Sequence, residues 1–402
     1  MKNYFSLIFV FTFVLSSYCQ GLKLAPKDRL QTLETFTIDE FGFSTSLPSS
    51  YSLEKYVPTV LDQGDSGACV GYSVVYYALS TMYNVELNIT DNQEKLAFSF
   101  DPMFIYSLMN TKTHCNDGLY IDEALEKLMI NGAKKIFMDP LYVSCNKGWT
   151  LSDLKNVKSY SRPFAISNAH EINVEDGINT INEVKYLIKN NKPVVIGLRL
   201  PSSFDKISST GLWWDTKSET TDSNDGHAMC IVGYDDIKYG GAFRVVNSWG
   251  DDFGDNGYVW MKYKDFYYYS YKAYTFSIAE NLFPFKNEQI KEGPFVRKVF
   301  GNGDIYEGEV SNDMFNGKGI LKKDGEIFIG KFRDNKPNGD FIMIYENDIY
   351  FPTYDYFGNL IEMKDEYGFA TEVSKEQAKK EEYFNLMIPK LELKTSKSAR
   401  KN

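Results

Sequence analysis

Two segments near the C-terminal end of the chain repeat each other, and this repeat constrains the fold more than any other feature. The segments are IYEGEVSNDMFNGKGIL and IFIGKFRDNKPNGDFIM, aligned at an offset of 22 residues. The matched positions are Tyr306 with Phe328, Gly308 with Gly330, Asn316 with Asn338, and Gly317 with Gly339. Aromatic residues are expected where strands pack, and we expect the glycines at hairpin turns. The repeat therefore predicts a small all-β extension over residues 292–363.

The chain before this extension changes from helical to β patterns. Residues 72–83 contain no Gly or Pro and predict a helix, and residues 120–133 carry apolar residues at helical spacing that end at a glycine. Residues 181–200 predict a helix, a turn and a buried strand. From residue 226, the apolar runs HAMCIVGYDD and AFRVVNSWG predict neighbouring strands joined by a polar turn. We therefore expect an α+β fold with two lobes, one helical and one of antiparallel strands.

The first residues, MKNYFSLIFVFTFVLSSYCQG, have the layout of a secretory signal peptide, which we place at residues 1–19. The apolar run is too short to span a bilayer, and we expect no transmembrane segment after its removal. The protein is therefore predicted to be secreted or periplasmic. Residues 20–47 are expected to form a polar, irregular N-terminal segment, and residues 364–402 a charged tail. The net charge of −10 argues against a nucleic-acid partner.

Four cysteines remain after removal of the signal peptide, and export permits them to form disulfides. They are Cys69, Cys115, Cys145 and Cys230. Four cysteines would ordinarily indicate two disulfides. If one of them is a nucleophile, at most one disulfide remains.

The glycine-rich stretch DQGDSGACVGYS predicts a turn that leads into a helix at Cys69. The positive end of a helix dipole favours a thiolate there, although cysteine is also a common small core residue. Among three histidines, His227 follows Gly226 at a strand start. Asn247 ends an apolar strand on the adjacent hairpin, where it can orient an imidazole or simply form a turn. Gln63 lies six residues before Cys69 and can reach back across the turn.

These segments resemble the papain-like cysteine peptidase family over residues 48–283. The resemblance rests on DQGDSGACVGYS, GHAMCIVGYDD and NSWGDDFGDNGYVWM, in the family's order. It implies that Cys69 is the nucleophile, that His227 is its proton partner and that Asn247 orients His227. The resemblance implies no metal and no cofactor.

Two further roles follow from the resemblance. Gln63 would join the backbone amide of Cys69 in holding the oxyanion. Trp249 would shield the hydrogen bond between the histidine and the asparagine, although a plain core role is an alternative.

Two of the departures from the family concern the disulfides and the propeptide. Ser66 stands where many members carry a cysteine, so the resemblance implies that Cys115 pairs instead with Cys145, whose setting DPLYVSC resembles another bridging position. Between the signal peptide and Leu47 there is no room for the family's long helical propeptide. If the peptidase is held inactive before use, that inhibition must arise in another way.

The C-terminal repeat resembles MORN repeats, through Tyr-Glu-Gly and Asn-Gly-Lys-Gly in YEGEVSNDMFNGKG. That resemblance implies protein or lipid contacts. The alternative is a small β extension that packs on the peptidase or spaces it from something else.

The sequence thus predicts an exported cysteine peptidase that acts on a peptide or protein substrate. Two rivals stay open: a non-catalytic binding protein on the same fold, and a transpeptidase that passes its acyl group to an amine.

Overall fold

The computed structural model describes most of the chain between residues 21 and 365. The described ranges are 21–24, 33–38, 47–110, 114–136, 164–201, 226–278, 295–301, 303–324, 326–345 and 348–365, with several single residues between them. The predicted signal peptide and residues 366–402 of the predicted tail lie outside the described residues.

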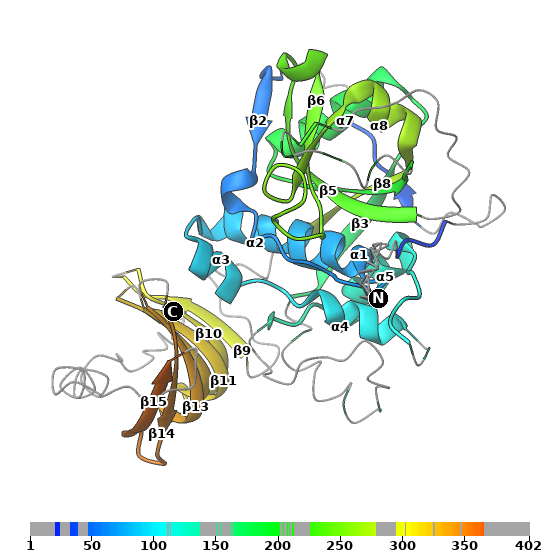
Figure 1. Cartoon of the computed structure of the whole chain (residues 1–402). Helices are drawn as coiled ribbons and strands as arrows, with labels where there is room; N and C mark the ends of the chain where they lie inside the picture. The colour runs from blue at the N-terminus through cyan, green and yellow to red at the C-terminus, as the bar shows by residue number, and fades with distance from the viewer. Residues whose placement is uncertain are drawn as a thin grey trace, which may run out of the picture.

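The elements form three groups (Figure 1). A larger sheet and two helices stand at the top of the view, a group of helices lies in the middle, and a separate C-terminal sheet lies below the helices. The α+β, two-lobed fold with an all-β C-terminal extension is therefore confirmed.

The helices come mainly from the first half of the chain. Their bounds are η2 (Glu54–Tyr56), α1 (Cys69–Gly71), η3 (Tyr72–Leu79), α2 (Ser80–Leu87), α3 (Asn92–Ala97), α4 (Pro102–Met109), α5 (Ile121–Asn131), α7 (Ile178–Lys189), η7 (Lys238–Gly240) and α8 (Tyr263–Tyr269). The helix predicted over 120–133 is α5, and it ends at Gly132, whose φ of 73° suits glycine. The helix predicted over 72–83 extends in both directions, because α1, η3 and α2 follow one another without a break from Cys69 to Leu87.

The larger sheet has the strand order β1-β3-β8-β4-β5-β6-β7, with β2 also paired to β5. Its strands are β1 (Glu34–Thr35), β2 (Ser50–Ser52), β3 (Ile166–Ile172), β4 (Val194–Arg199), β5 (Gly226–Asp235), β6 (Ala242–Val246), β7 (Tyr258–Lys262) and β8 (Ser270–Ile278). The predicted hairpin of two apolar strands is β5 and β6, which pair antiparallel. The segment expected to be irregular contains β1, which pairs with β3.

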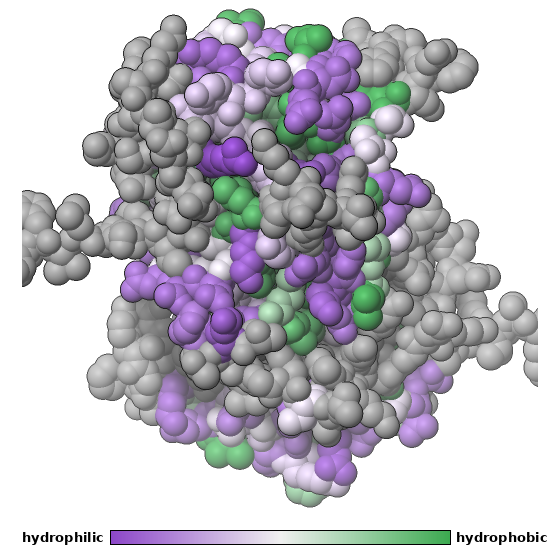
Figure 2. Space-filling view, turned by 90° about the vertical axis from the view of Figure 1, so that its right-hand side faces the viewer, coloured by the Kyte–Doolittle hydropathy of each residue, from purple (hydrophilic) through white to green (hydrophobic). Residues whose placement is uncertain are grey.

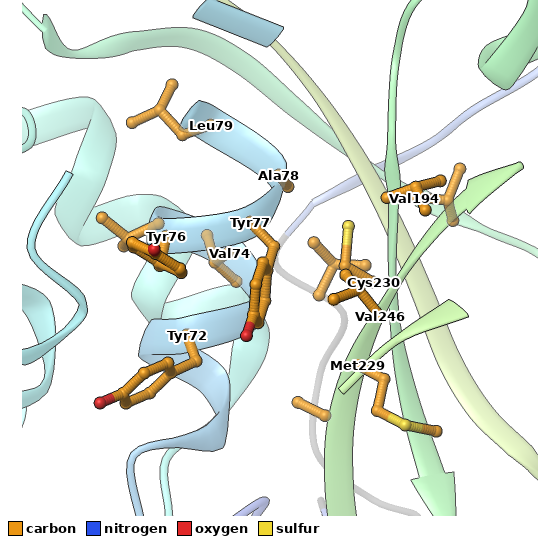
Figure 3. Close-up of a cluster of buried hydrophobic side chains, with 14 of the residues drawn as sticks. Tyr72, Val74, Tyr76, Tyr77, Ala78, Leu79, Val194, Met229, Cys230 and Val246 are labelled. Carbon is orange, nitrogen blue, oxygen red and sulfur yellow. The ribbon is translucent and has the colours of Figure 1, made fainter. Parts of the chain in front are cut away.

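The long helix packs against this sheet through a tightly filled core. Every residue of η3, a π-helical stretch, is buried. Figure 3 shows Tyr77 and Ala78 of this helix facing Cys230 and Val246 of the sheet. The helix that begins at Cys69 is therefore held directly against β5.

The C-terminal sheet is a seven-stranded antiparallel meander. Its strands are β9 (Phe295–Val299), β10 (Ile305–Ser311), β11 (Met314–Lys323), β12 (Glu326–Arg333), β13 (Lys336–Tyr345), β14 (Asp348–Tyr354) and β15 (Leu360–Asp365). Asn and Asp residues with φ between 48° and 69° form its hairpin turns at 312–313 and 334–335.

The expectation that the repeat glycines lie at the hairpin turns is wrong. Gly308 and Gly330 lie within strands, and both align with Gly319 of the strand between them. A Cβ atom on Gly308 would lie 2.5 Å from the Tyr306 hydroxyl, and one on Gly330 would lie 2.6 Å from the Phe341 ring. These glycines therefore make room for aromatic rings on the sheet.

Figure 2 shows one face of the molecule, on which hydrophobic residues are scattered among hydrophilic ones. Within the described part of the chain, none of the helices combines the length and the hydrophobicity that crossing a membrane requires.

Candidate active site

Cys69 is the first residue of α1 and follows a tight turn. The Gly67 N–H donates to the Cys115 carbonyl over 2.7 Å, and a Cβ atom at Gly67 would lie 2.4 Å from the carbonyl oxygen of Asp117. Only glycine allows this close approach between the two chain segments. The turn thereby fixes the start of the helix, where Cys69 is buried and is not disulfide-bonded.

His227 lies on β5, and its ring is oriented by Asn247, which directly follows β6. The distance between His227 Nε2 and Asn247 Oδ1 is 2.7 Å. The backbone N–H of Ser248 also donates to Asn247 Oδ1, over 2.9 Å, so this atom acts as an acceptor. His227 Nε2 must then be the donor. In the neutral ring, Nδ1 is left unprotonated, and this atom is buried without a hydrogen-bond partner among the residues that the structure describes.

Aromatic side chains cover the His227 ring. The ring centroid of Trp249 lies 4.8 Å from that of His227, and Phe204 and Phe253 pack against Trp249 at 5.3 Å and 4.9 Å. Burial lowers the pKa of His227 to about 4, against the smaller opposing effect of its hydrogen bond to Asn247. This low pKa favours the uncharged form of the imidazole at neutral pH.

The side chain of Gln63 is held at both ends of its amide group. Its oxygen accepts from the Ser248 hydroxyl over 2.6 Å, and its nitrogen donates to the Ser66 carbonyl over 2.7 Å. The amide nitrogen of Gln63 is therefore on the side of the turn that leads to Cys69.

Backbone contacts bring these residues from distant parts of the chain into one site. The Gln63 N–H donates to the Ser248 carbonyl over 2.8 Å, and Asp62 forms an antiparallel bridge with Trp249. The turn before Cys69 is thus joined to the segment after Asn247. Because α1 also packs against β5, the two sheet residues and the helix N-terminus belong to the same region.

The other cysteines and histidines lie elsewhere. Cys230 is a buried thiol in the core between the helix and the sheet (Figure 3), where burial raises its pKa. Cys115 is disulfide-bonded, whereas Cys145 lies outside the described residues, so the predicted pairing stays a prediction. His114 is more than half exposed, and His170 lies on β3, near the other edge of the sheet. Among the described residues, no group of three or more His, Cys, Asp or Glu side chains is arranged to hold a metal.

The N-terminal segment Gly21–Leu24 lies between the two lobes at this site. The Leu22 N–H donates to Gly226, next to His227, over 3.0 Å. On the other side, the Lys23 N–H donates to Leu119 over 2.9 Å, and the Leu119 N–H donates to the Gly21 carbonyl over 2.8 Å. Leu22 is 7% exposed. We call residues 21–24 the N-terminal strap.

The sequence did not predict the strap, Ser248 or Phe204 as parts of the site. Ser248 had a signal, because it directly follows Asn247. The strap had none, since apart from the burial of Leu22 its contacts are made by backbone atoms and by close approach of glycines.

Comparison with known proteins places the chain in a family. The family model described as papain family cysteine protease matches residues 47–276. Thiol protease aleurain of Arabidopsis thaliana is 26% identical over 51% of this chain and 52% of its own length, and vignain of Vigna mungo is 28% identical over 57% of each chain. The chain thus spans little more than half the length of these relatives. The solved structure of xylellain, a cysteine protease from Xylella fastidiosa, has a TM-score of 0.51 at 20% identity and covers 65% of this chain and 98% of xylellain.

Proposed function

Because the chain belongs to the papain family of cysteine proteases, we propose that it is an exported peptidase that hydrolyses peptide bonds through Cys69 and His227. The observation that carries this proposal is the hydrogen bond of 2.7 Å between His227 Nε2 and Asn247 Oδ1. It fixes the ring tautomer in which Nδ1 can accept a proton from the thiol.

The reaction begins when Cys69 Sγ gives its proton to His227 Nδ1 and attacks the carbonyl carbon of the substrate. A C–S bond forms, and the electron pair of the carbonyl double bond moves to its oxygen. The side-chain N–H of Gln63 and the backbone N–H of Cys69 donate to this oxyanion; removal of one such donor often reduces the rate by roughly 10²-fold. His227 then protonates the nitrogen of the leaving amine, and the C–N bond breaks.

Water completes the cycle. His227 Nδ1 takes a proton from the attacking water, the thioester bond breaks, and Cys69 recovers its proton. In the free enzyme Cys69 and His227 share one proton, so their titration belongs to the pair; in the thioester intermediate that proton has left with the amine, and the attacking water supplies a new one. The low pKa of the buried His227 favours return of the proton at each step.

The finer parts of the proposal rest on the sequence. The apolar N-terminal run supports export, and the substrate is a peptide or a protein. The motif residues of the C-terminal repeat support a MORN-type sheet, for which a protein or lipid contact is the proposed partner class. Trp249, which packs on the His227 ring at 4.8 Å, is proposed to exclude water from the hydrogen bond to Asn247.

The test is labelling by a peptidyl epoxide across pH, with Cys69→Ala and His227→Ala as comparisons. Wild type is expected to label at mildly acidic pH, where an ordinary thiol with a pKa of about 8.5 is protonated, because unprotonated His227 Nδ1 takes the thiol proton as the sulfur attacks. Cys69→Ala should not label, and His227→Ala should label only as an ordinary thiol does. Wild-type labelling that follows the ordinary thiol titration would refute the catalytic pair and favour a binding protein. A peptide substrate with an added amine then separates hydrolysis from transfer, through the product that forms.

A further inference from the structure

One face of the C-terminal sheet is a surface of isoleucines that packs on the helical lobe. The strand register places Glu307, Ile320, Ile329 and Ile342 side by side across β10, β11, β12 and β13. Ile320 and Ile329 are at most 3% exposed and belong to the same core cluster as the buried residues of the peptidase region. The face is therefore part of a common core.

Glu307 is the charged residue of this row, and it is buried completely. Its carboxylate lies 3.7 Å from the Nζ atom of Lys135, which belongs to the helical lobe and is equally buried. Lys135 Nζ also donates to the Phe98 carbonyl and lies 3.5 Å and 4.0 Å from the ring centroids of Tyr83 and Phe100. The lysine thus sits in an aromatic cage that the sheet closes from outside.

The neighbouring lysine provides an internal contrast. Lys134 is 1% exposed, and its Nζ atom lies 3.2 Å from Asp101, a residue of its own lobe. Consecutive buried lysines therefore pair with carboxylates from two different parts of the chain. Among the described residues, Glu307 is the carboxylate within ion-pair distance of Lys135, so the helical lobe alone leaves this cation uncompensated.

A second charge pair crosses the same interface closer to solvent. Lys322 lies on β11, directly opposite Ile305 of β10 and Ile327 of β12. Its Nζ atom contacts the Glu94 carboxylate of α3. Glu307 and Lys322, two charged residues of the isoleucine face, therefore each meet an opposite charge on the helical lobe, which fixes the orientation of the sheet.

We propose that the C-terminal sheet is a permanent part of the peptidase fold, docked by the Lys135–Glu307 pair, and neither a spacer nor an independently mobile module. Separation of the sheet would expose the isoleucine face and leave a cation in a cage of rings. Burial of each residue disfavours its charged form, which raises the pKa of Glu307 and lowers that of Lys135. The charged form of each side chain is therefore stabilised in this interface by the charge of the other.

The docked sheet also supports the helix that carries the nucleophile. Tyr83 of the cage lies in α2, the end of the continuous helix that begins at Cys69. The backbone N–H of Phe100, another cage residue, donates to the Ser80 hydroxyl of the same helix over 3.0 Å. The sheet therefore packs near the opposite end of that helix from the thiol.

The experiment uses the full chain with a protease site inserted between residues 278 and 295. The purified protein is cut at this site after folding and then passed over a sizing column under native conditions. We expect the two pieces to elute together. Pieces that separate would overturn the proposal, because a spacer or a mobile module comes free when its linker is cut.

Variants then test the ion pair in the cut protein. Glu307→Gln should raise the dissociation constant of the pieces on the order of 10²-fold or more, because it leaves Lys135 buried without a counter-charge. The double variant Lys135→Met/Glu307→Met should restore most of the affinity, since it removes both charges and keeps apolar volume. Glu362→Gln, which removes a half-exposed charge on β15, is the matched control. Equal affinities of wild type and Glu307→Gln, or a double variant as weak as Glu307→Gln, would refute the role of the pair. If Glu307→Gln does not fold, recovery of a folded protein in the double variant gives the same answer.

Discussion

The N-terminal strap leads to a sharp prediction, because Gly21 lies against the backbone of the turn before Cys69. A Cβ atom at Gly21 would lie 2.1 Å from the oxygen, 2.2 Å from the carbonyl carbon and 2.5 Å from the Cα atom of Gly67. Backbone atoms of that turn cannot move aside without moving Cys69. The substitution Gly21→Ala should therefore displace the strap from between the lobes and leave the catalytic residues themselves unchanged.

The size of the effect follows from what holds the strap. Its three backbone hydrogen bonds contribute about 0.5–1.5 kcal/mol each, and burial of Leu22 contributes about 1.5–3 kcal/mol. Ordering four residues costs about 1–2 kcal/mol each, so the closed state is only marginally favoured. Overpacking typically costs about 1–3 kcal/mol. The ratio of open to closed molecules should therefore rise roughly 5- to 150-fold in Gly21→Ala.

The assay is the initial rate at which a peptidyl epoxide labels Cys69 on the intact chain, followed by mass spectrometry. Gly21→Ala should label faster than wild type by this factor, up to the rate of a permanently open site. Lys23→Ala is the matched control, because Lys23 belongs to the same strap but its side chain is exposed. Equal rates in Gly21→Ala, Lys23→Ala and wild type would show that the strap does not restrict access, and the reasoning would fail.

Three further predictions concern the site and its surroundings. Ser248→Ala removes the hydroxyl that donates to the Gln63 side-chain oxygen over 2.6 Å, so kcat/KM for a peptide substrate should fall roughly 10-fold. The rate at which iodoacetamide alkylates Cys69 should stay unchanged. A parallel fall in both rates would contradict a role of Ser248 in oxyanion binding. In a Cys69→Ala background, the free energy of unfolding should decrease by about 3 kcal/mol as the pH falls from 6.5 to 4. Over this range His227 is protonated in the unfolded chain, whereas in the folded chain burial lowers its pKa to about 4 and keeps it largely unprotonated. Urea unfolding should show this loss much reduced when His227→Gln is added, and an unchanged loss would refute the assignment. Cys145→Ser should expose the Cys115 thiol to a maleimide under non-reducing denaturing conditions and reduce stability by about 2–4 kcal/mol, unless Cys115 has another partner.

The fold could be predicted where one segment carries its own pattern. Helix α5 was found from the apolar spacing of residues 121–128 and the stop at Gly132, and the hairpin of β5 and β6 was found from two apolar runs. The extent of the long helix could not be found in this way. Its central stretch is buried on every side, so its residues show no polar face and no boundary.

The site could be predicted in part, because its main residues stand in segments with recognisable residue order. Asn247 was expected to orient His227, and the two side chains lie in hydrogen-bond contact; their catalytic roles stay predictions. The contacts of Ser248 with Gln63 and of Glu307 with Lys135 join residues that lie 172 to 185 positions apart. No local sequence pattern predicts such contacts, because each of these residues resembles an ordinary polar surface residue when its own segment is considered alone. The error over the repeat glycines has the same origin, since their neighbours are rings on other strands.

The long helix explains why these distant contacts matter to one another. The N-terminal end of this helix lies beside the strap, and its C-terminal end lies beside the cage that the C-terminal sheet closes. Between these ends, the tyrosines and small residues of η3 are close-packed against β5, so the helix has little freedom to tilt. The proposed proton transfer requires Cys69 to keep its place relative to His227 within a few tenths of an ångström, and such precision is easier to hold on a rigid element than on a loop. A sheet that fills the outer side of the helical lobe therefore contributes to the geometry of a thiol that it does not touch. The need for a fixed orientation explains why Glu307 and Lys135 are buried in this interface. Isoleucines alone would bind the sheet to the helical lobe without fixing its orientation.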